Sequence, residues 1–162
     1  NLNFAHTIGR QFLFDVYHLA FLAELQKSTD LTLSAIANKC IKEVSYHERF
    51  SSDWVKRLGD GTAESKEKIQ EAINDLWTYT DELFHQTKAD KAMVLESVGV
   101  DVTKLKDNYY KRVKDLLEEA TLQIPDYKWF QKGGKEGIHT EHLGYLLTDL
   151  QYMQRTYPNM EW

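Results

Sequence analysis

The sequence has 162 residues, the length of one domain, so we expect residues 1–162 to fold as a single domain around its own core. Its composition, 42% hydrophobic, 28% charged and 12% aromatic, is typical of a globular protein and excludes a disordered chain. A net charge of −5 disfavours nucleic acid as a partner, and no apolar run is long enough to cross a membrane. Only 2 Pro and 8 Gly argue against a turn-dense β fold.

Hydrophobic periodicity predicts five helices, of which the first two are the most apolar. The first covers residues 4–26 and is apolar nearly all the way round, which is typical of a central, buried helix. The second covers residues 31–58. Asp30 or Ser28 can cap its start, and the glycine-rich turn Gly59-Asp60-Gly61 ends it.

The remaining three helices are separated by one ordered, aromatic-rich loop. The third is expected to run from its N-cap Thr62 to residue 86, and the fourth from about residue 101 to 120. The loop over residues 121–137 precedes a last helix from about residue 140 to 157. The fourth and last helices each carry an apolar stripe: Val102, Leu105, Tyr109, Val113, Leu116, Leu117 and Ala120, and Leu143, Leu146, Leu147, Leu150 and Met153. No segment indicates a strand, so the predicted fold class is all-α.

Two central helices each bring a carboxylate and an imidazole toward the predicted core. Asp15 and His18 lie within the apolar run of the first helix, and Glu43 and His47 lie on the second. We expect the latter two to share a core-facing stripe of residues, namely Ile36, Cys40, Glu43, His47, Phe50 and Trp54. A lone buried charge is too costly to persist, so these groups must pair with one another, with a cation or with a metal.

Carboxylates and imidazoles inside a helical bundle suggest a di-iron or di-manganese site as one hypothesis. The usual pattern takes a Glu from each of two helices and a Glu-x-x-His motif from each of two others. Glu43 and His47 are four residues apart rather than three, and Asp15 with His18 has the spacing but a shorter acid. A polar network within the bundle is therefore favoured over a metal site.

Other candidate groups have simpler interpretations. Glu82 and His85 have Glu-x-x-His spacing but are predicted to face solvent. A cluster at the start of the last helix, His139, Glu141 and His142, is explained by helix capping and first-turn charge. Cys40 is expected to pack in the core, and as the single cysteine it excludes an internal disulfide framework.

Several specific strings resemble one known family along the whole chain. The strings are Asn3-Phe4-Ala5-x-Thr7-Ile8-x-Arg10-Gln11, Lys42-Glu43-x-x-Tyr46-His47-x-Arg49-Phe50-Ser51, Arg57-Leu58-Gly59-x-Gly61-Thr62 and Gly133-Gly134-Lys135-x-Gly137-x-His139-Thr140-Glu141-His142-Leu143-Gly144. This pattern is similar to the structural C-subunits of multicomponent phenylacetyl-CoA epoxidases, enzymes of aerobic phenylacetate breakdown.

The resemblance implies a ferritin-like helical bundle and a non-catalytic role. In such complexes a catalytic A-subunit holds the di-iron centre and binds the thioester, a reductase supplies electrons, and one oxygen atom of O2 is inserted to give the ring-1,2-epoxide. The C-subunit is a structural partner, so no cofactor, metal or catalytic residue is expected in this chain. The positions Asp15, His18, Glu43 and His47 would be degenerate di-iron-like positions. Further subunits are expected partners, and the location is expected to be cytoplasmic.

The alternative is a carboxylate-bridged di-iron oxygenase subunit with a metal site of its own, supplied by those same four residues. The resemblance also implies two further N-terminal helices. Because the sequence starts at Asn1 without a methionine and turns helical at once, we expect a chain truncated at its N-terminus. Without such helices, part of the first helix's apolar surface would be exposed.

Overall fold

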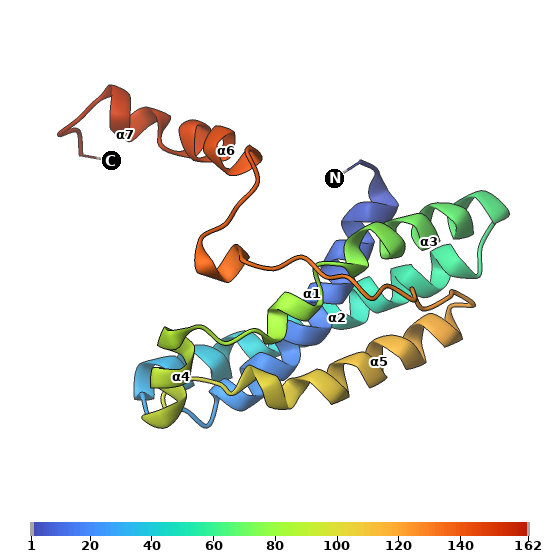
Figure 1. Ribbon diagram of the computed structural model, residues 1–162, viewed down its shortest axis with the longest axis horizontal. Coiled ribbons are helices and arrows are strands. Elements are labelled where there is room, and N and C mark those ends of the chain that lie inside the picture. The colour runs from blue at the N-terminus through green and yellow to red at the C-terminus, as the bar shows by residue number, and fades with distance from the viewer. Residues whose placement is uncertain (1, 162) are drawn as a thin grey trace. The chain divides into compact units, whose positions relative to one another are not determined.

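The computed structural model describes residues 2–161, and within that range it contains helices and loops but no strand (Figure 1). The predicted all-α class, a ferritin-like helical bundle, is confirmed. The chain divides into two compact units, Asn1–Gln131 and Lys132–Trp162, which are described separately. The single-domain organisation expected for residues 1–162 stays a prediction.

The first two helices have the bounds that their sequence signals predict, to within one residue. α1 spans Phe4–Leu25 and α2 spans Leu31–Gly59. Asn3 caps α1 by accepting a hydrogen bond from the backbone N–H of His6. Asp30 caps α2 by accepting from the backbone N–H groups that open it, which satisfies donors that the helix itself leaves free.

The third helix is shorter than predicted. α3 spans Ala63–Trp77 and is followed by the 3-10 helix η1, Asp81–Phe84, so the expectation of one helix to residue 86 is wrong. The Thr80 hydroxyl donates to the Trp77 carbonyl over 2.8 Å. This side-chain bond occupies a carbonyl at the helix end and favours a turn over a further helical turn.

The segment after η1 contains a helix that the periodicity did not reveal. α4 spans Lys88–Leu95 and buries none of its residues, so it has no apolar stripe to detect. Its sequence signal is a capping box: Thr87 accepts from the backbone of Asp90, and the Asp90 carboxylate accepts from the backbone of Thr87. The backbone N–H of Thr29 donates to the Ser97 carbonyl, which ties the end of this segment to the α1–α2 turn.

The fourth predicted helix is present as two consecutive elements. The 3-10 helix η2, Val102–Leu105, leads directly into α5, Lys106–Glu119, and Asp101 caps the start of η2. The whole predicted stripe is buried, from Val102 to Ala120. Periodicity therefore gives the correct core face of this helix.

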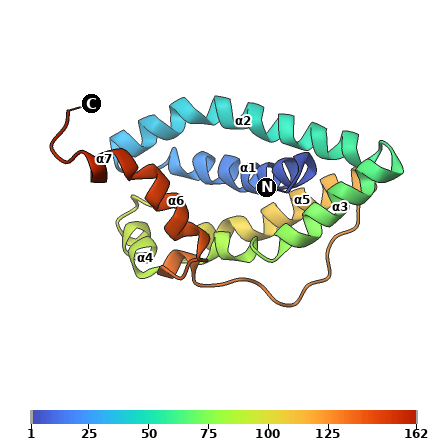
Figure 2. The same cartoon turned by 90° about the horizontal axis from the view of Figure 1, so that it is seen from above.

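α1 is the central helix of the first unit. Figure 2 shows it between α2 and α5, and it also packs against α3. Phe12 is fully buried at its centre, a burial that contributes about 1.5–3 kcal/mol. The buried His6 ring lies 2.9 Å from an Asp75 oxygen and so links α1 to α3. Phe4 and Phe14 remain about half exposed, so one side of α1 is open.

The second unit contains three short helices. These are the 3-10 helix η3, Gly134–Glu136, then α6, His142–Leu150, and α7, Tyr152–Thr156. The last predicted helix is thus broken near Gln151. None of the residues in its predicted apolar stripe, Leu143 to Met153, is buried in the structure described. No helix within residues 2–161 is long and apolar enough to cross a membrane.

The close approach of α2 to the end of α5 gives a first prediction. A Cβ at Gly59 would overlap the Ala120 carbonyl, whereas a Cβ at Gly144 would meet nothing within 4 Å. We expect Gly59→Ala to lower the free energy of unfolding by about 1–3 kcal/mol, because backbone must move to make room. The matched Gly144→Ala should not destabilise. Urea denaturation measures both, and a Gly59→Ala protein as stable as the wild type would contradict the packing described.

Candidate functional site

Asp15 is a buried carboxylate at the interface between α1 and α2, with 1% of its surface exposed. Gln11, one turn earlier on α1, donates its Nε2–H to Asp15 Oδ1 over 2.6 Å. The Ser51 hydroxyl of α2 donates to Asp15 Oδ2 over 2.9 Å. Each carboxylate oxygen therefore has a partner, which offsets the cost of removing the group from water.

Ser51 can reach Asp15 because α2 presents a row of small side chains to α1. The buried residues of α2 include Ala37, Val44, Ser51 and Val55. Small residues let two helix backbones approach closely, so a short hydroxyl can bridge them. The Ser51 Oγ also lies 3.0 Å from the His47 carbonyl. With one proton to donate, it makes its stronger bond to the charged carboxylate.

Two histidines lie close to this carboxylate. His18 follows Asp15 by one turn of α1 and is half-buried, with its ring 5.1 Å from that of Phe14. His47 of α2 is also half-buried, and its Nε2 is 3.9 Å from Glu43 Oε1. The structure thus brings three of the four predicted residues, Asp15, His18 and His47, within electrostatic range of one another.

The environment shifts the pKa values of this cluster in opposite directions. Burial raises the pKa of Asp15, while the hydrogen bonds from Ser51 and Gln11 and the nearby histidines oppose that rise. Burial lowers the pKa of His18, and Asp15 opposes that fall. Both shifts disfavour the charged form of the group concerned.

Glu43 is not where the sequence pattern placed it. Its side chain is 74% exposed, and Ile36 and Phe50 of the same predicted core stripe are 49% and 44% exposed. The buried stripe instead runs one position later, through Ala37, Val44, Ser51 and Val55, a rotation of about 100° around the helix. The expected core-facing stripe is therefore wrong at these three positions, because the small stripe packs against α1. Cys40 and Trp54 of the predicted stripe are half-buried and do pack against core residues.

The arrangement of these side chains does not fit a di-metal site. Among residues 2–161, no group of three or more His, Cys, Asp and Glu side chains is placed to hold a metal ion. Asp15 already accepts two hydrogen bonds within the protein, and Glu43 extends toward solvent. What the cluster can do is hold a proton on or near a buried carboxyl group. That the four positions are a degenerate metal site stays a prediction.

The other candidate groups lie elsewhere. Glu82 lies on η1 and is half-buried, and His85 follows η1 and is exposed. Both residues interact with other residues. The cluster of His139, Glu141 and His142 is exposed, and Glu141 makes no capping hydrogen bond to α6. Cys40 is half-buried and packs against a small second core cluster of Leu22, Ala37 and Val44, as expected for a packing role.

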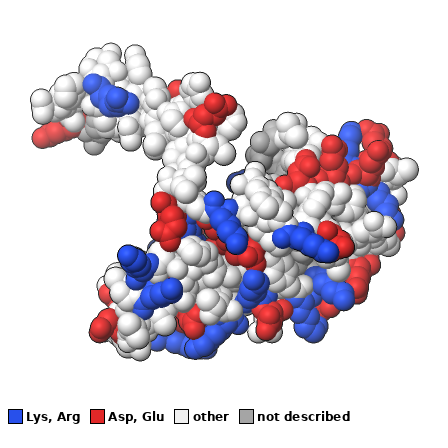
Figure 3. Space-filling view, in the orientation of Figure 1, with Lys and Arg blue, Asp and Glu red and all other residues white. Residues whose placement is uncertain are grey.

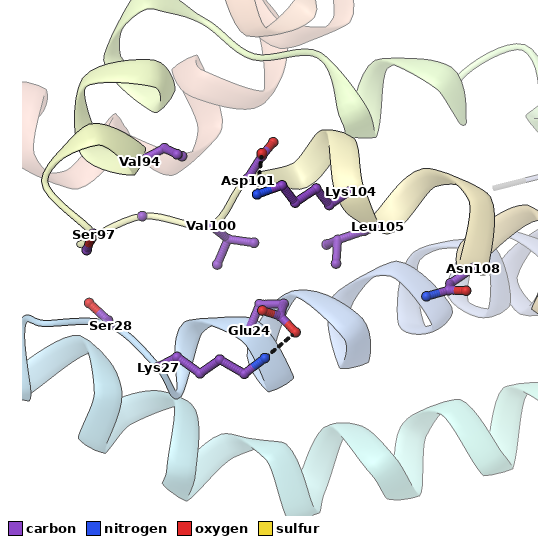
Figure 4. A pocket seen from close by; sticks show the side chains of 11 residues that line it. Glu24, Lys27, Ser28, Val94, Ser97, Val100, Asp101, Lys104, Leu105 and Asn108 are labelled. Atoms are coloured by element: carbon purple, nitrogen blue, oxygen red, sulfur yellow. Dashed lines mark hydrogen bonds and ion pairs between the residues drawn. The ribbon is translucent and has the colours of Figure 1, made fainter.

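A polar pocket of about 400 Å³ lies between the end of α1 and the segment that leads into α5 (Figure 4). Lys27 pairs with Glu24 over 2.7 Å in its wall, and Lys104 pairs with Asp101 over 3.4 Å. Its four charged side chains are thus already in ion pairs. The pocket offers no uncompensated charge to a ligand.

Gln11 and Ser51 are the functional neighbours that sequence reasoning missed. Gln11 had a local signal, because a Gln four residues before an Asp on a helix is placed to bond to it. Ser51 had none, because its contact with Asp15 depends on how two helices pack across 36 residues of sequence.

These features define an all-α bundle with a satisfied carboxylate–hydroxyl network between its two longest helices. The chain belongs to the family described as "Phenylacetic acid catabolic protein", whose sequence model matches residues 1–162. It is similar to the C-subunit of 1,2-phenylacetyl-CoA epoxidase from Escherichia coli (strain K12), with 45% identity over 162 residues. The match covers 100% of this chain and 65% of that relative's length.

The raised pKa of Asp15 gives a pH prediction. Above pH 3.8, the ordinary pKa, Asp15 keeps its proton in the folded state after the unfolded state has lost it. The contribution of Asp15 to the free energy of unfolding therefore falls as pH rises from 3.8 through the raised pKa. Asp15→Asn keeps the shape and removes this titration. We therefore expect its stability relative to the wild type to improve as pH rises through that window.

Ser51→Ala is the companion variant. It removes a hydrogen bond that lowers the pKa of Asp15, so the loss of stability with rising pH should extend to higher pH. Urea denaturation over a pH series measures both variants. A stability difference between Asp15→Asn and the wild type that stays constant with pH would contradict the buried-carboxyl assignment.

Proposed function

We propose that this chain is a non-catalytic structural subunit of a multicomponent phenylacetyl-CoA 1,2-epoxidase, a monooxygenase complex of aerobic phenylacetate catabolism. Its role is to stabilise the di-iron catalytic subunit. The similarity to a protein named as the C-subunit of that epoxidase supports membership of this complex. The match to the family described as "Phenylacetic acid catabolic protein" supports a role in phenylacetate catabolism.

The observation that carries the structural role is the state of Asp15. One of its oxygens accepts a hydrogen bond from Gln11 and the other accepts one from Ser51. The carboxylate that could most readily have bridged two metal ions is thus used to join α1 to α2. Glu43 extends toward solvent, and its Oε1 lies 3.9 Å from Nε2 of the half-buried His47 on the same helix. The arrangement of Asp15, Glu43 and His47 therefore favours a contribution to the stability of the fold over metal binding. In this proposal the reaction with O2 takes place in the catalytic subunit.

Exposed aromatic and aliphatic side chains support a role in assembly. In the loop before the second unit, Trp129 is 63% exposed, while the neighbouring Phe130 packs against the core and the backbone N–H of Gln131 donates to the Thr78 carbonyl over 2.8 Å. This anchoring presents Trp129 on a fixed loop. Within α6, Tyr145 and Leu150 are more than half exposed. Such side chains are typical of protein interfaces.

The proposed partners follow from this role. They are the catalytic A-subunit with its di-iron centre, further subunits of the complex and a reductase. The chain itself is proposed to carry no cofactor. The proposal includes a cytoplasmic location, because the epoxidase acts on an acyl-CoA substrate.

Iron analysis tests the proposal. We expect the purified chain to contain no stoichiometric iron, and the complex obtained by co-expression with the catalytic subunit to contain about two irons for each catalytic subunit. The double variant Glu43→Gln/His47→Gln should leave the iron content and the epoxidase activity of the complex unchanged.

The runner-up function makes the opposite prediction. A chain with its own di-iron site would bind about two irons alone and lose them in the double variant. That result would overturn the structural role and require the chain to be assayed as an oxygenase. Circular dichroism of the double variant excludes loss of the fold as the cause.

A further inference from the structure

The outer side of α2 carries one continuous row of exposed side chains. We call it the α2 outer stripe. Successive members are one, three or four residues apart, so they lie on one face of the helix over about 27 Å. Figure 2 shows α2 at the margin of the first unit, with α1 on its inner side. Glu43 borders the stripe and lies beside His47 of the same helix. The stripe consists of Lys39, Lys42, Tyr46, Arg49, Phe50, Asp53 and Arg57, all of them exposed.

The charge of this stripe is unlike that of the chain as a whole. It holds four cations and a single anion, Asp53, on a chain with a net charge of −5. Its four cations form no ion pair with any residue in the described range, 2–161. Elsewhere, several lysines and arginines are paired with carboxylates, for example Lys56 with Glu119 and Arg112 with Glu48. Acidic and basic groups are also interspersed on the face that Figure 3 displays.

Aromatic rings run through and beside the same stripe. Phe4 of α1 contacts Trp54 with ring centroids 5.1 Å apart, Trp54 contacts Phe50, and Phe50 stacks on Tyr46. Two of the unpaired arginines lie on these rings. Arg49 is 5.5 Å from the Tyr46 centroid and Arg57 is 5.5 Å from the Trp54 centroid. The rings therefore hold the guanidinium groups against the helix surface.

We propose that the α2 outer stripe is a docking surface for a protein partner whose contact surface carries Asp and Glu side chains around apolar residues. Exposed Tyr, Phe and Trp rings with adjacent arginines have the composition of binding hot spots. When a partner covers these unpaired cations, carboxylates opposite them complement their charge. This inference rests on the proposed function, which makes the partner the catalytic subunit of the epoxidase.

A second copy of this chain is a poor occupant for the stripe. In a symmetric dimer the same surface patch meets itself, so four cations of one stripe would face four of the other. Like charges placed opposite each other cost several kcal/mol. An acidic partner surface meets the same cations favourably.

The test is the affinity of the chain for the purified di-iron catalytic subunit, measured by titration calorimetry at two ionic strengths. Raising the ionic strength from about 0.01 M to about 0.1 M shortens the screening length from about 30 Å to about 10 Å and should weaken binding. Arg49→Glu/Arg57→Glu should weaken binding about tenfold or more and reduce its salt dependence. Tyr46→Ala/Phe50→Ala should weaken binding to a similar extent with the salt dependence retained.

Lys111→Glu/Lys114→Glu on α5 is the matched control. It makes the same change of net charge at exposed positions outside the stripe. We expect its affinity to stay within about twofold of the wild type, since these residues do not face the partner. Thermal unfolding of each variant confirms that the bundle is intact.

The outcomes separate this inference from the function on which it rests. If the wild-type chain does not bind the catalytic subunit, the proposed partnership fails. If it binds and the stripe variants bind equally well, the partnership stands and the docking surface is wrong. If instead the chain dimerises in sedimentation experiments and the Arg49→Glu/Arg57→Glu variant does not, the occupant is a second copy and the proposal is overturned.

Discussion

A carboxylate buried between two helices constrains how those helices can pack. Asp15 is removed from water in the middle of α1, and the Ser51 hydroxyl of α2 together with Gln11 satisfies its oxygens. A slide of either helix by one turn would leave the carboxylate without its inter-helical partner, at a cost of about 1–3 kcal/mol or more for a charged group. The network therefore fixes the register of α1 on α2, and through α1 it fixes the surface on which α3 and α5 pack.

The same register gives α2 two different faces. Its inner face is lined by small residues such as Ala37 and Ser51, which allow close approach to α1. Its outer face carries Tyr46 and Phe50, which would be too large for that approach and remain at the surface. Steric fit, rather than hydrophobicity alone, thus decides which face enters the core. A helix of this kind can be structural on one side and available to a partner on the other.

The fold was largely predictable because its main signals are local. Caps such as Asp30 and the apolar run of α1 gave correct bounds, and the stripe of α5 gave the correct core face. The candidate site was only partly predictable, since burial of Asp15 followed from the apolar run while its bond to Ser51 arises from tertiary packing. The failure at Glu43 has a related cause. Two adjacent stripes of α2 are apolar, and periodicity cannot choose between faces one residue apart.

The helices of the second unit are short and bury no side chain. α6 has nine residues and α7 has five, and isolated helices below about 12–15 residues are marginal in water. No side chain within residues 132–161 is buried, although Leu146, Leu147 and Leu150 form an apolar row on α6. Their helical state thus gains little from burial in the structure described. A partner surface that covers this row would supply the missing apolar contact, so assembly and the ordering of these helices would be coupled.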